Sequence, residues 1–472
     1  MKQLVVMKFG GTSVGSAERI KDVAAIVQEA SAKYRVAVVV SAMSGVTDML
    51  VRAAESAESK NKAAYQRAIE EIRSKHHEAI EALGLSLDES QALISTIEQQ
   101  LVDLSDWLEG VYMLRELTPR ARDLITSFGE RLSIHLVAAA LKNTNTFSKA
   151  VSAASCIVTD ENFGDAQPNL AASTTHAEAI LRPLIEEGIV PVITGFLGAT
   201  PKGIISTLGR GGSDYSATIV GYCLDADEVW IWTDVTGVMT ADPRIIPGAR
   251  TIDALSYDEA AELSYFGAKV LHPLTMVPAA LKHIPIVIKN TMDSAAPGTR
   301  ITKNVAIDPH GVKAITSMKG LSLITVQGRV MTGVPGFAAR VFGALAAAKI
   351  SVMFISQASS QYNISLVVRH ADGSRANQAL RETFQHELTV HNIEMVKLQE
   401  ELAIIAVVGE GMHGHPGVAG NTFASLGAGD INIIAIAQGS SERNISLVIH
   451  ETDVPKAVQH IHDVFKLERS TV

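Results

Sequence analysis

The chain has 472 residues, more than the roughly 250–300 at which a single hydrophobic core stops growing, so we expect two or three domains. Hydrophobic residues make up 47% of the chain and charged residues 19%, and the mean hydropathy is +0.19, which excludes an intrinsically disordered protein. The 41 Lys and Arg residues are outnumbered by 50 Asp and Glu, giving a net charge of −9. This balance argues against a dedicated nucleic-acid-binding protein, so any phosphate must be held by a local site.

Cysteine content and apolar runs indicate the cellular compartment. Two cysteines, Cys156 and Cys223, are too few for a disulfide framework or a cysteine-based zinc site, and we expect buried, inert thiols. The apolar run at the N-terminus ends at Lys8 and is too short for a signal peptide. Apolar stretches such as residues 402–408 reach strand length rather than the ~20 residues of a membrane span. We therefore expect a cytoplasmic protein with no membrane partner.

Strand and helix patterns alternate along the first 300 residues. The chain begins with a buried strand, an amphipathic helix over residues 17–32 and a second buried strand. From about residue 51 to residue 120 it is rich in Ala, Glu, Gln and Lys at helical spacing, which predicts a helical insertion with the pair His76-His77 on a solvated face. Buried strands are predicted at residues 4–8, 35–41, 189–193, 228–232 and 284–289. This alternation predicts an α/β fold with a mainly parallel sheet covered by helices.

Past about residue 304 the chain contains an internal repeat with an offset of 81 residues. The offset aligns Gly328 with Gly409, and it aligns residues 363–367 with residues 444–448 without a mismatch. No gap is needed over some 40 positions, so the match is not a chance event. Each copy predicts strand, helix, strand, strand, helix, which is the order of the ferredoxin-like βαββαβ fold.

Four motifs have residue types suited to chemistry. Residues 8–13 follow a buried strand and precede a helix, so the two glycines and Lys8 suit an anion held by backbone N–H groups and a helix N-terminus. Residues 207–214 contain three glycines around Arg210 and are followed by further motifs at residues 232–244 and 266–273. We expect all but the last at the carboxyl ends of strands, where open α/β sheets bind ligands.

In this order the motifs resemble those of the aspartate kinases of the amino acid kinase family. Eight stretches support the resemblance, which covers essentially the whole chain: KFGGTSVGS (8–16), SAMSGVTD (41–48), SFGERLS (127–133), TGFLG (194–198), TLGRGGSDYSA (207–217), WTDVTGV (232–238), ADPR (241–244) and FGAKVLHP (266–273). The resemblance implies an amino acid kinase catalytic domain over residues 1–304, with the helical insertion at about 51–120. Two ferredoxin-like ACT domains would follow, over residues 305–395 and 396–472.

The implied reaction transfers the γ-phosphoryl group of ATP to the β-carboxylate of L-aspartate. The product would be 4-phospho-L-aspartate, at the start of lysine, threonine and methionine biosynthesis. A carboxylate with a pKa near ~4 is already ionised at pH 7, so the acceptor needs no general base. The obstacle is the approach of two anions, which cations and amide dipoles around the phosphates would relieve. Mg²⁺ is implied, held mainly through the ATP phosphates, and no protein ligand to the metal is named.

The resemblance also assigns roles to individual residues. Implied catalytic residues are Lys8, Asp214 and Lys269, and implied substrate-binding residues are Thr47, Glu130, Arg210 and Ser213. Implied nucleotide-binding residues are Lys8, Gly10, Gly11, Ser13, Gly211, Gly212, Thr233, Asp234, Met239, Arg244 and Lys269. Met239 stands where relatives often have tyrosine.

The tandem repeat implies feedback regulation and assembly. Gln357, Gln438, Asn363 and Asn444 are the implied effector-binding residues, and the Gln-x-Ser-Ser stretches resemble those of threonine-sensitive relatives. Threonine is therefore the expected inhibitor, with lysine second because Glu442 lies close by in the sequence. A homodimer or higher homo-oligomer through the ACT domains is expected, since residues 351–357 and 431–438 are apolar nearly throughout, which suits burial on both faces or pairing between subunits.

Two alternatives remain at this point, and a third is disfavoured. The chain could be a catalytically inactive amino-acid sensor of the ACT type, although Lys8, Arg210, Asp214 and Lys269 are all present. It could be another amino acid kinase family member that acts on a different carboxylate. A bifunctional kinase–homoserine dehydrogenase is disfavoured by the length of the chain.

Overall fold

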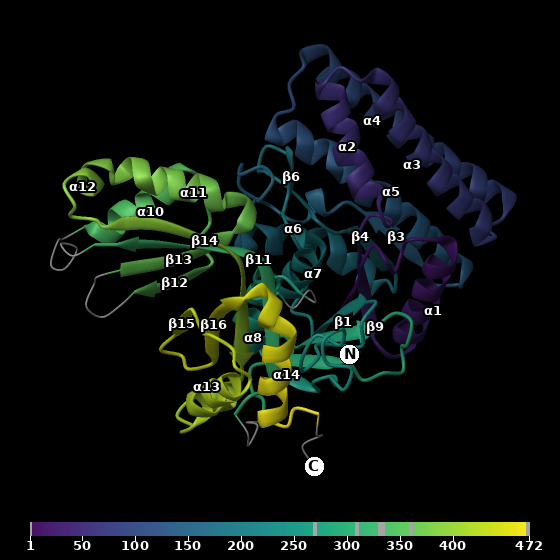
Figure 1. Ribbon diagram of the computed structural model, residues 1–472. Coiled ribbons are helices and arrows are strands. Elements are labelled where there is room, and N and C mark those ends of the chain that lie inside the picture. Colours follow the sequence, from purple (N-terminus) through teal and green to yellow (C-terminus); the bar gives the residue numbers. More distant parts are fainter. Residues whose placement is uncertain (1, 268–270, 307–310, 329–335, 358–362, 469–472) are drawn as a thin grey trace. The chain divides into compact units, whose positions relative to one another are not determined.

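The computed structural model describes residues 2–267, 271–306, 311–328, 336–357 and 363–468 (Figure 1). The chain forms two compact units. The first consists of Met1–Val238, Asp253–Ala260 and Val270–Val305, and the second of Met239–Ile252, Ala261–Lys269 and Ala306–Val472. Two short stretches of chain that interrupt the first unit in sequence therefore belong to the second.

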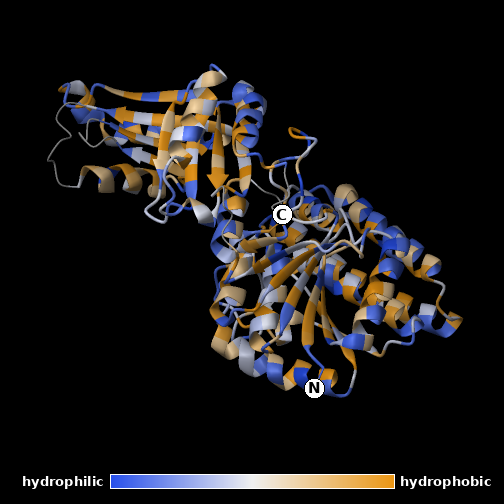
Figure 2. Ribbon diagram, turned by 90° about the horizontal axis from the view of Figure 1, so that it is seen from below, coloured by the Kyte–Doolittle hydropathy of each residue, from blue (hydrophilic) through white to orange (hydrophobic). Residues whose placement is uncertain are grey.

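An eight-stranded sheet forms the centre of the first unit. Its strand order is β3-β4-β2-β1-β7-β9-β10-β8, and every neighbouring pair is parallel except β9 and β10. The strands are β1 (Leu4–Phe9), β2 (Arg35–Val40), β3 (Ser148–Val151), β4 (Val190–Thr194), β7 (Glu228–Thr233), β8 (Ala254–Ser256), β9 (Ile286–Asn290) and β10 (Thr299–Thr302). The five strands predicted from apolar runs are present and differ by at most two residues at either end. Figure 2 shows the hydrophobic colouring of this sheet, which agrees with burial between two helical layers.

Helices cover the sheet in two groups, so the α/β fold class is confirmed. The helices α1 (Ala17–Lys33) and α5 (Pro119–Asn143) pack together on the sheet, and α6 (Leu170–Glu186), α7 (Gly212–Cys223) and α9 (Pro273–Lys282) form the other group. Of the described helices, α5 alone is long and apolar enough to cross a membrane, and 78% of its apolar window is buried within the protein. Such burial is typical of a core helix in a globular fold.

The helical stretch after β2 is present and begins earlier than predicted. It comprises α2 (Val46–Glu58), α3 (Lys62–Leu83) and α4 (Leu87–Leu114), which lead into α5. A reciprocal capping box between Ser86 and Glu89 starts α4, and Gly84, in the left-handed region with φ +73°, ends α3. The core of this bundle is continuous with the core on one side of the sheet.

The prediction that His76 lies on a solvated face is wrong. Its side chain is fully buried, and its Nδ1 atom lies 2.7 Å from the carbonyl oxygen of Ile72, one turn earlier. His77 is half-buried and lies 2.8 Å from Glu98. The charged neighbours of His76 in the sequence suggested a solvated face, but position 76 lies on the buried, apolar face of α3. Cys156 and Cys223 are buried as predicted, and burial raises the pKa of each thiol to about 11.

The second unit contains a six-stranded antiparallel sheet in the order β12-β13-β11-β14-β16-β15. Its strands are β11 (Ala314–Gln327), β12 (Phe354–Gln357), β13 (Asn363–Arg369), β14 (Met395–Val408), β15 (Ala435–Gln438) and β16 (Asn444–His450). Its helices are α10 (Phe337–Ala347), α11 (His370–Thr383), α12 (Gln385–Thr389), α13 (Val418–Ala428) and α14 (Val454–Val464). Smaller elements of the chain are β5 (Leu197–Ala199), β6 (Ile205–Thr207), α8 (Tyr257–Tyr265) and the 3₁₀ turns Ala153–Ser155, Glu410–Met412 and Glu451–Asp453.

The two repeats share their longest strands. Residues 321–327 of β11 pair with β13 of the first repeat, whereas residues 314–318 pair with residues 404–408 of β14, which in turn pair with β16. In the sequence, the rest of the first repeat therefore lies between residues 314–318 and residues 404–408, two segments that pair with each other in the sheet of the second repeat. The domain boundaries near residues 304 and 395 stay predictions.

The edge strands β12 and β15 are shorter than the apolar runs suggested. Ile355 and Ile436 are 48% and 41% exposed, so the expectation of burial on both faces is wrong for this chain by itself. The remaining expectation, pairing between subunits, stays a prediction.

The buried His76 should make stability depend on pH. Burial lowers the pKa of His76 to about 4, whereas an unfolded histidine titrates near ~6.5. Protons therefore bind preferentially to the unfolded chain as the pH falls below ~6.5, and stability should drop by roughly 2 kcal/mol between pH 8 and pH 5. In urea unfolding followed by circular dichroism, His76→Leu should lose that part of the pH dependence. The control His176→Leu, at an exposed position on α6, should retain it; an unchanged pH profile in His76→Leu would contradict the assignment.

Candidate active site

The loops that follow three neighbouring parallel strands meet at one edge of the eight-stranded sheet. In the register, Phe9 of β1 lies beside Val40 of β2 on one side and Trp232 of β7 on the other. The residues that come next, Gly10-Gly11, Ser41-Ala42 and Thr233-Asp234, are therefore brought together. Carboxyl ends of parallel strands are where open α/β sheets bind ligands, and two of the predicted motifs lie here.

Glycines allow two further elements to approach this edge closely. A Cβ atom on Gly129 of α5 would lie 2.7 Å from the Cβ of Ala42, and one on Gly195 would lie 2.7 Å from the Cβ of Ser213. Side chains at these positions would push α5 and the first turn of α7 away from the strand ends. The glycine-rich turn 207–214 therefore reaches the site. We expected this turn to follow a strand of the main sheet, but it follows β6 of the small two-stranded sheet β5-β6.

These elements enclose a pocket of about 600 Å³. Of the residues predicted for the site, those that line it are Lys8, Gly11, Thr47, Glu130, Arg210, Gly211, Gly212, Ser213, Asp214, Thr233 and Asp234. Additional lining residues, which sequence reasoning did not single out, are Thr12, Ser41, Ala42, Met43, Ser44, Gly45, Asp48, Phe196 and Gly209. Several of them lie in the stretch 41–48, which was recognised as a motif although only Thr47 was assigned a role.

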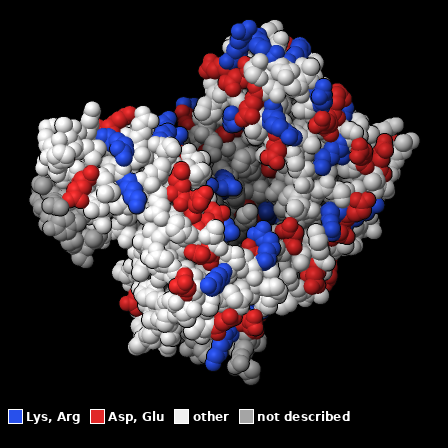
Figure 3. Space-filling view, viewed as in Figure 1, with Lys and Arg blue, Asp and Glu red and all other residues white. Residues whose placement is uncertain are grey.

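Lys8 and Asp214 form an ion pair in the wall of the pocket. Lys8 Nζ lies 2.6 Å from Asp214 Oδ1, and the two side chains are 10% and 14% exposed. Asp214 belongs to the first turn of α7, whose free backbone N–H groups and helix dipole provide positive potential at the same place. On the face shown in Figure 3, basic and acidic side chains are interspersed over the described surface, which agrees with anion binding by a local site.

Glu130 is the most strongly perturbed acid of the pocket. It is 3% exposed, its Oε1 atom accepts a hydrogen bond from the backbone N–H of Ala42 at 3.1 Å, and its Oε2 atom has no partner among the described residues. Burial raises the pKa of Glu130 to about 8, so the side chain is mostly neutral at pH 7 before any ligand binds. A cationic group near Oε2 would stabilise the ionised form and lower this pKa.

Asp123 supports the glycine-rich turn from behind, a role that sequence reasoning missed. Its Oδ2 atom accepts hydrogen bonds from the N–H groups of Thr207 at 2.8 Å and Gly164 at 2.9 Å, and its Oδ1 atom accepts one from the Thr207 hydroxyl at 2.8 Å. Asp123 lies two turns before Glu130 on α5, so one helix connects both sides of the pocket. In the sequence Asp123 stands directly after Arg122 near the start of α5, so no local pattern signals this role.

Comparison with known proteins identifies the family. The model of the amino acid kinase family matches residues 3–290, and an ACT domain model matches residues 324–384 and 405–465. Aspartokinase 2 of Arabidopsis thaliana is 34% identical over 467 residues, which cover 98% of this chain and 84% of the relative. The chain belongs to the aspartokinases of the amino acid kinase family.

Solved aspartokinases have the same fold. Escherichia coli aspartokinase III, in complex with aspartate and ADP, is 31% identical, with a TM-score of 0.83 over 98% of this chain and 99% of that one. Its complex with lysine and aspartate gives a TM-score of 0.78. The bifunctional aspartokinase/homoserine dehydrogenase of Haemophilus influenzae is 36% identical over 97% of this chain but only 56% of its own length. The chain thus spans about half the length of the bifunctional relatives it matches.

Several residues predicted for the nucleotide do not line the pocket of this aspartokinase. Ser13 is 2% exposed, and its hydroxyl lies 2.8 Å from that of Thr291. Gly10 is buried at the end of β1, outside the pocket lining. Met239 and Arg244 belong to the second unit, where Arg244 forms an exposed ion pair with Asp242 at 2.6 Å. Lys269 lies outside the described residues.

The predicted effector residues lie in the second unit. Gln357 and Gln438 end the edge strands β12 and β15, and both are exposed. Asn363 and Asn444 begin β13 and β16 at equivalent places, and Asn444 donates a hydrogen bond to Glu262 at 2.9 Å. The Ser-Ser pair of the first repeat lies outside the described residues.

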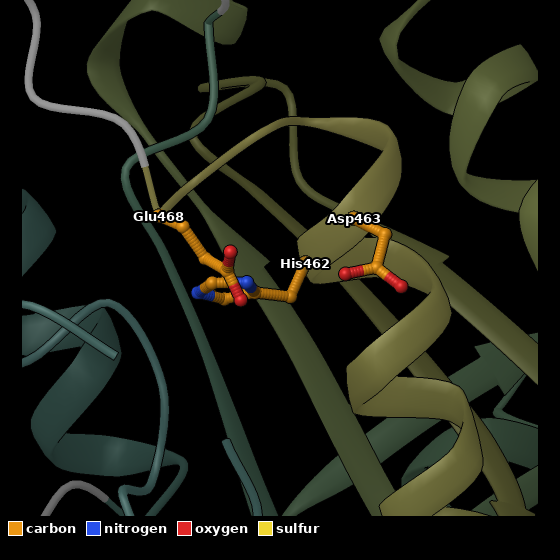
Figure 4. Close-up of side chains that lie close together, drawn as sticks. All are labelled: His462, Asp463 and Glu468. Atoms are coloured by element: carbon orange, nitrogen blue, oxygen red, sulfur yellow. The ribbon is translucent and has the colours of Figure 1, made fainter. Parts of the chain in front are cut away.

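A group of potential metal ligands lies in the second unit, at the end of α14 (Figure 4). One ligand atom each of His462, Asp463 and Glu468 lies within 4.8 Å of the others, and His462 is fully buried. Both carboxylate-bearing residues are exposed, and Arg250 adds a positive charge beside His462.

The raised pKa of Glu130 predicts proton release when an amino acid binds in the pocket. An ammonium group beside Oε2 needs the ionised carboxylate, so binding at pH 7 should release roughly 0.9 of a proton if the pKa falls from about 8 to well below 7. Affinity for an amino acid bound in this way should accordingly rise from pH 6 to pH 8. Calorimetric titration in buffers of different ionisation enthalpy measures the released protons.

The variant Glu130→Gln should abolish this release and weaken binding, whereas Glu29→Gln, at an exposed position on α1, should change neither quantity. Binding of aspartate to the wild type without proton release would contradict contact between Glu130 and the ammonium group.

Proposed function

We propose that this aspartokinase family member transfers the γ-phosphoryl group of ATP to the β-carboxylate of L-aspartate, giving 4-phospho-L-aspartate. The observation that carries the proposal is the convergence of the Lys8–Asp214 ion pair, Arg210 and Glu130 on one pocket. These groups suit the two charged ends of an amino acid and the anionic phosphates. The solved relative that contains both aspartate and ADP supports the pairing of these ligands.

The roles follow from charge and position. Glu130 would bind the α-ammonium group with Thr47 beside it, and Arg210 would hold the α-carboxylate through two parallel hydrogen bonds, helped by Ser213. Lys8 would stabilise the transferring phosphoryl group, since it lies at the end of β1 just before the glycines. Asp214 would orient Lys8, because Lys8 Nζ already lies 2.6 Å from Asp214 Oδ1.

The nucleotide would lie along the glycine-rich edge. The amides of Gly11 and Gly211 are suited to phosphate oxygens, whereas the N–H groups of Gly10 and Gly212 already donate to the carbonyl oxygens of Trp232 at 3.4 Å and Gly209 at 3.1 Å. Thr233 ends β7 and Asp234 follows it at the same edge. Mg²⁺ would be carried mainly by the phosphates of ATP, where it would neutralise charge during transfer. We name no protein ligand to the metal.

Regulation and assembly extend the proposal. The tandem ACT repeats would bind an end-product amino acid, with threonine as the first candidate and lysine, which is bound by a solved relative, as the second. We further propose a homodimer or higher homo-oligomer formed through these repeats. The enzyme would act in the cytoplasm, in the biosynthesis of lysine, threonine and methionine.

A coupled assay of ADP formation with L-aspartate, ATP and Mg²⁺ tests the activity. Formation of an acyl phosphate that hydroxylamine traps supports the proposal. ADP formation only with a different carboxylate would identify another acceptor, and amino-acid binding without any ADP formation would identify a sensor.

Removing the charge of Lys8 should lower turnover. In Lys8→Ala we expect kcat to fall by at least ~10²-fold, because the charge acts where negative charge develops in the transition state. Because this change also leaves Asp214 buried without its partner, folding is checked by circular dichroism, and the double variant K8A/D214N removes both charges. Lys21→Ala, on the exposed face of α1, is the control. Near-normal turnover by a folded Lys8→Ala enzyme would refute this role.

Threonine should inhibit the enzyme, and lysine alone should do so weakly or not at all. The amide groups of Gln357 and Gln438 offer both donors and acceptors for a hydroxyl and an ammonium group. Binding that favours an inactive state by ~1–3 kcal/mol would give roughly 5–150-fold inhibition. Gln438→Ala should abolish this inhibition while the activity without effector stays near normal. Inhibition by lysine together with indifference to threonine would contradict the assignment.

A further inference from the structure

The group of potential metal ligands at the end of α14 lies wholly within the second unit. His462, Asp463 and Glu468 each offer one ligand atom, and these atoms lie within 4.8 Å of one another. We propose that this group binds one Zn²⁺ ion through His462 Nδ1 and a carboxylate oxygen of each of the other two residues. None of the three lines the pocket, so the proposal does not rest on the proposed function.

The backbone brings Glu468 back beside the helix that carries the other two ligands. Lys466 has a left-handed conformation with φ +52°, and the N–H of Leu467 donates to the carbonyl oxygen of His462 at 3.2 Å. These features reverse the chain at the C-terminus of α14. Leu467 is buried in the hydrophobic cluster that also contains residues of α14. The three ligands are therefore held together by backbone structure and core packing.

The turn 240–250, which also belongs to the second unit, supports this reversal. Arg250 donates through Nε to the carbonyl oxygen of Leu467 at 3.1 Å. A Cβ atom on Gly248 would lie 2.9 Å from Glu468 Oε1, so the absence of a side chain at position 248 leaves room for the carboxylate. The carboxylate of Glu468 thus lies between the turn and the end of α14.

The buried ring of His462 is the feature that points to a cation. Its side chain is 0% exposed, and its Nδ1 atom has no hydrogen-bond partner among the residues that the structure describes. Figure 4 shows the carboxylates of Asp463 and Glu468 turned toward this ring. A buried polar atom without a partner loses the hydrogen bond that it would make in water. A metal ion bound by Nδ1 and the two carboxylates would remove this cost.

The other ring nitrogen has the kind of partner that metal-binding histidines use. His462 Nε2 lies 3.2 Å from Thr240 Oγ1, and this hydroxyl also accepts a hydrogen bond from the backbone N–H of Arg250 at 3.2 Å. Donation from Nε2–H to Thr240 selects the tautomer that has its lone pair on Nδ1. Histidines that bind metals commonly donate their second N–H in this way, which fixes the ring and strengthens the ligand.

The ligand set favours Zn²⁺ over Mg²⁺, because an imidazole nitrogen suits Zn²⁺ whereas Mg²⁺ prefers oxygen ligands in octahedral geometry. Ligands roughly 2.0–2.2 Å from a tetrahedral Zn²⁺ lie about 3.3–3.6 Å apart, so the group must contract slightly on binding. Asp463 and Glu468 are exposed and can make this movement, and water would be the fourth ligand. Their two charges outweigh the single positive charge of Arg250.

Titration of the full-length protein with ZnCl₂ at pH 7.5, after removal of metals by a chelator, tests the site. Calorimetry should show one Zn²⁺ bound per chain, and millimolar Mg²⁺ should not displace it. Saturating Zn²⁺ should raise the melting temperature, because a ligand that binds only the folded state stabilises it. The variants Asp463→Asn and Glu468→Gln, both at exposed positions, should each weaken Zn²⁺ binding at least about tenfold.

Glu382→Gln is the matched control. Glu382 is exposed on α11 and accepts a hydrogen bond from Gln378 four residues earlier, as Asp463 accepts one from Gln459. This variant should bind Zn²⁺ as the wild type does. Thr240→Val removes the hydroxyl next to the histidine and should weaken binding roughly 10–100-fold, whereas Thr240→Ser keeps the hydroxyl and should resemble the wild type.

The proposal is overturned if the wild type binds no Zn²⁺, or if the folded Asp463→Asn and Glu468→Gln variants bind it as tightly as the wild type. Unchanged affinity in folded Thr240→Val would contradict ligation by His462. His413 Nδ1 lies 3.5 Å from Glu442 Oε2, and loss of the bound Zn²⁺ in His413→Ala would place the ion at that exposed pair instead. Circular dichroism of each variant checks that it is folded.

Discussion

The ion pair between Lys8 and Asp214 joins the end of β1 to the first turn of α7, and the geometry of the pocket depends on it. A charge largely removed from water is costly unless it has a partner, so Asp214 compensates the charge of Lys8 and holds its side chain in place before any phosphate arrives. The 2.6 Å contact is possible only if α7 starts close to the strand ends, which requires glycine at position 195 and the support of Asp123 behind Thr207. Backbone packing thus fixes the electrostatics of the site.

The sequence predicted those parts of the structure that depend on residues close together in the chain. A short apolar run followed by Lys8 and two glycines predicts strand, turn and helix regardless of what surrounds it, and β1, the turn and α1 are present. The repeat with an offset of 81 residues likewise predicts two similar folds from comparison of the chain with itself. Local signals of this kind survive in the final structure because each uses residues adjacent in sequence.

What the sequence could not reveal depends on long-range packing. His76 was expected in solvent because its neighbours are charged, yet position 76 faces the seam between helices. The role of Asp123 arises from Thr207, 84 residues later, and no spacing rule connects them. The shared strands β11 and β14 also escaped notice, because alignment of two copies treats each as self-contained and does not show that residues 314–318 complete the second.

This sharing of strands also connects both repeats to the stretch of chain that ends at Gly267. Since β11 belongs to both repeats, a shift in either one is transmitted to Thr316 and Ser317, which lie against Phe266 and Gly267. Each hydrogen bond that attaches this stretch contributes only about 0.5–1.5 kcal/mol net, so a few of them together match the ~1–3 kcal/mol that typically couples two sites.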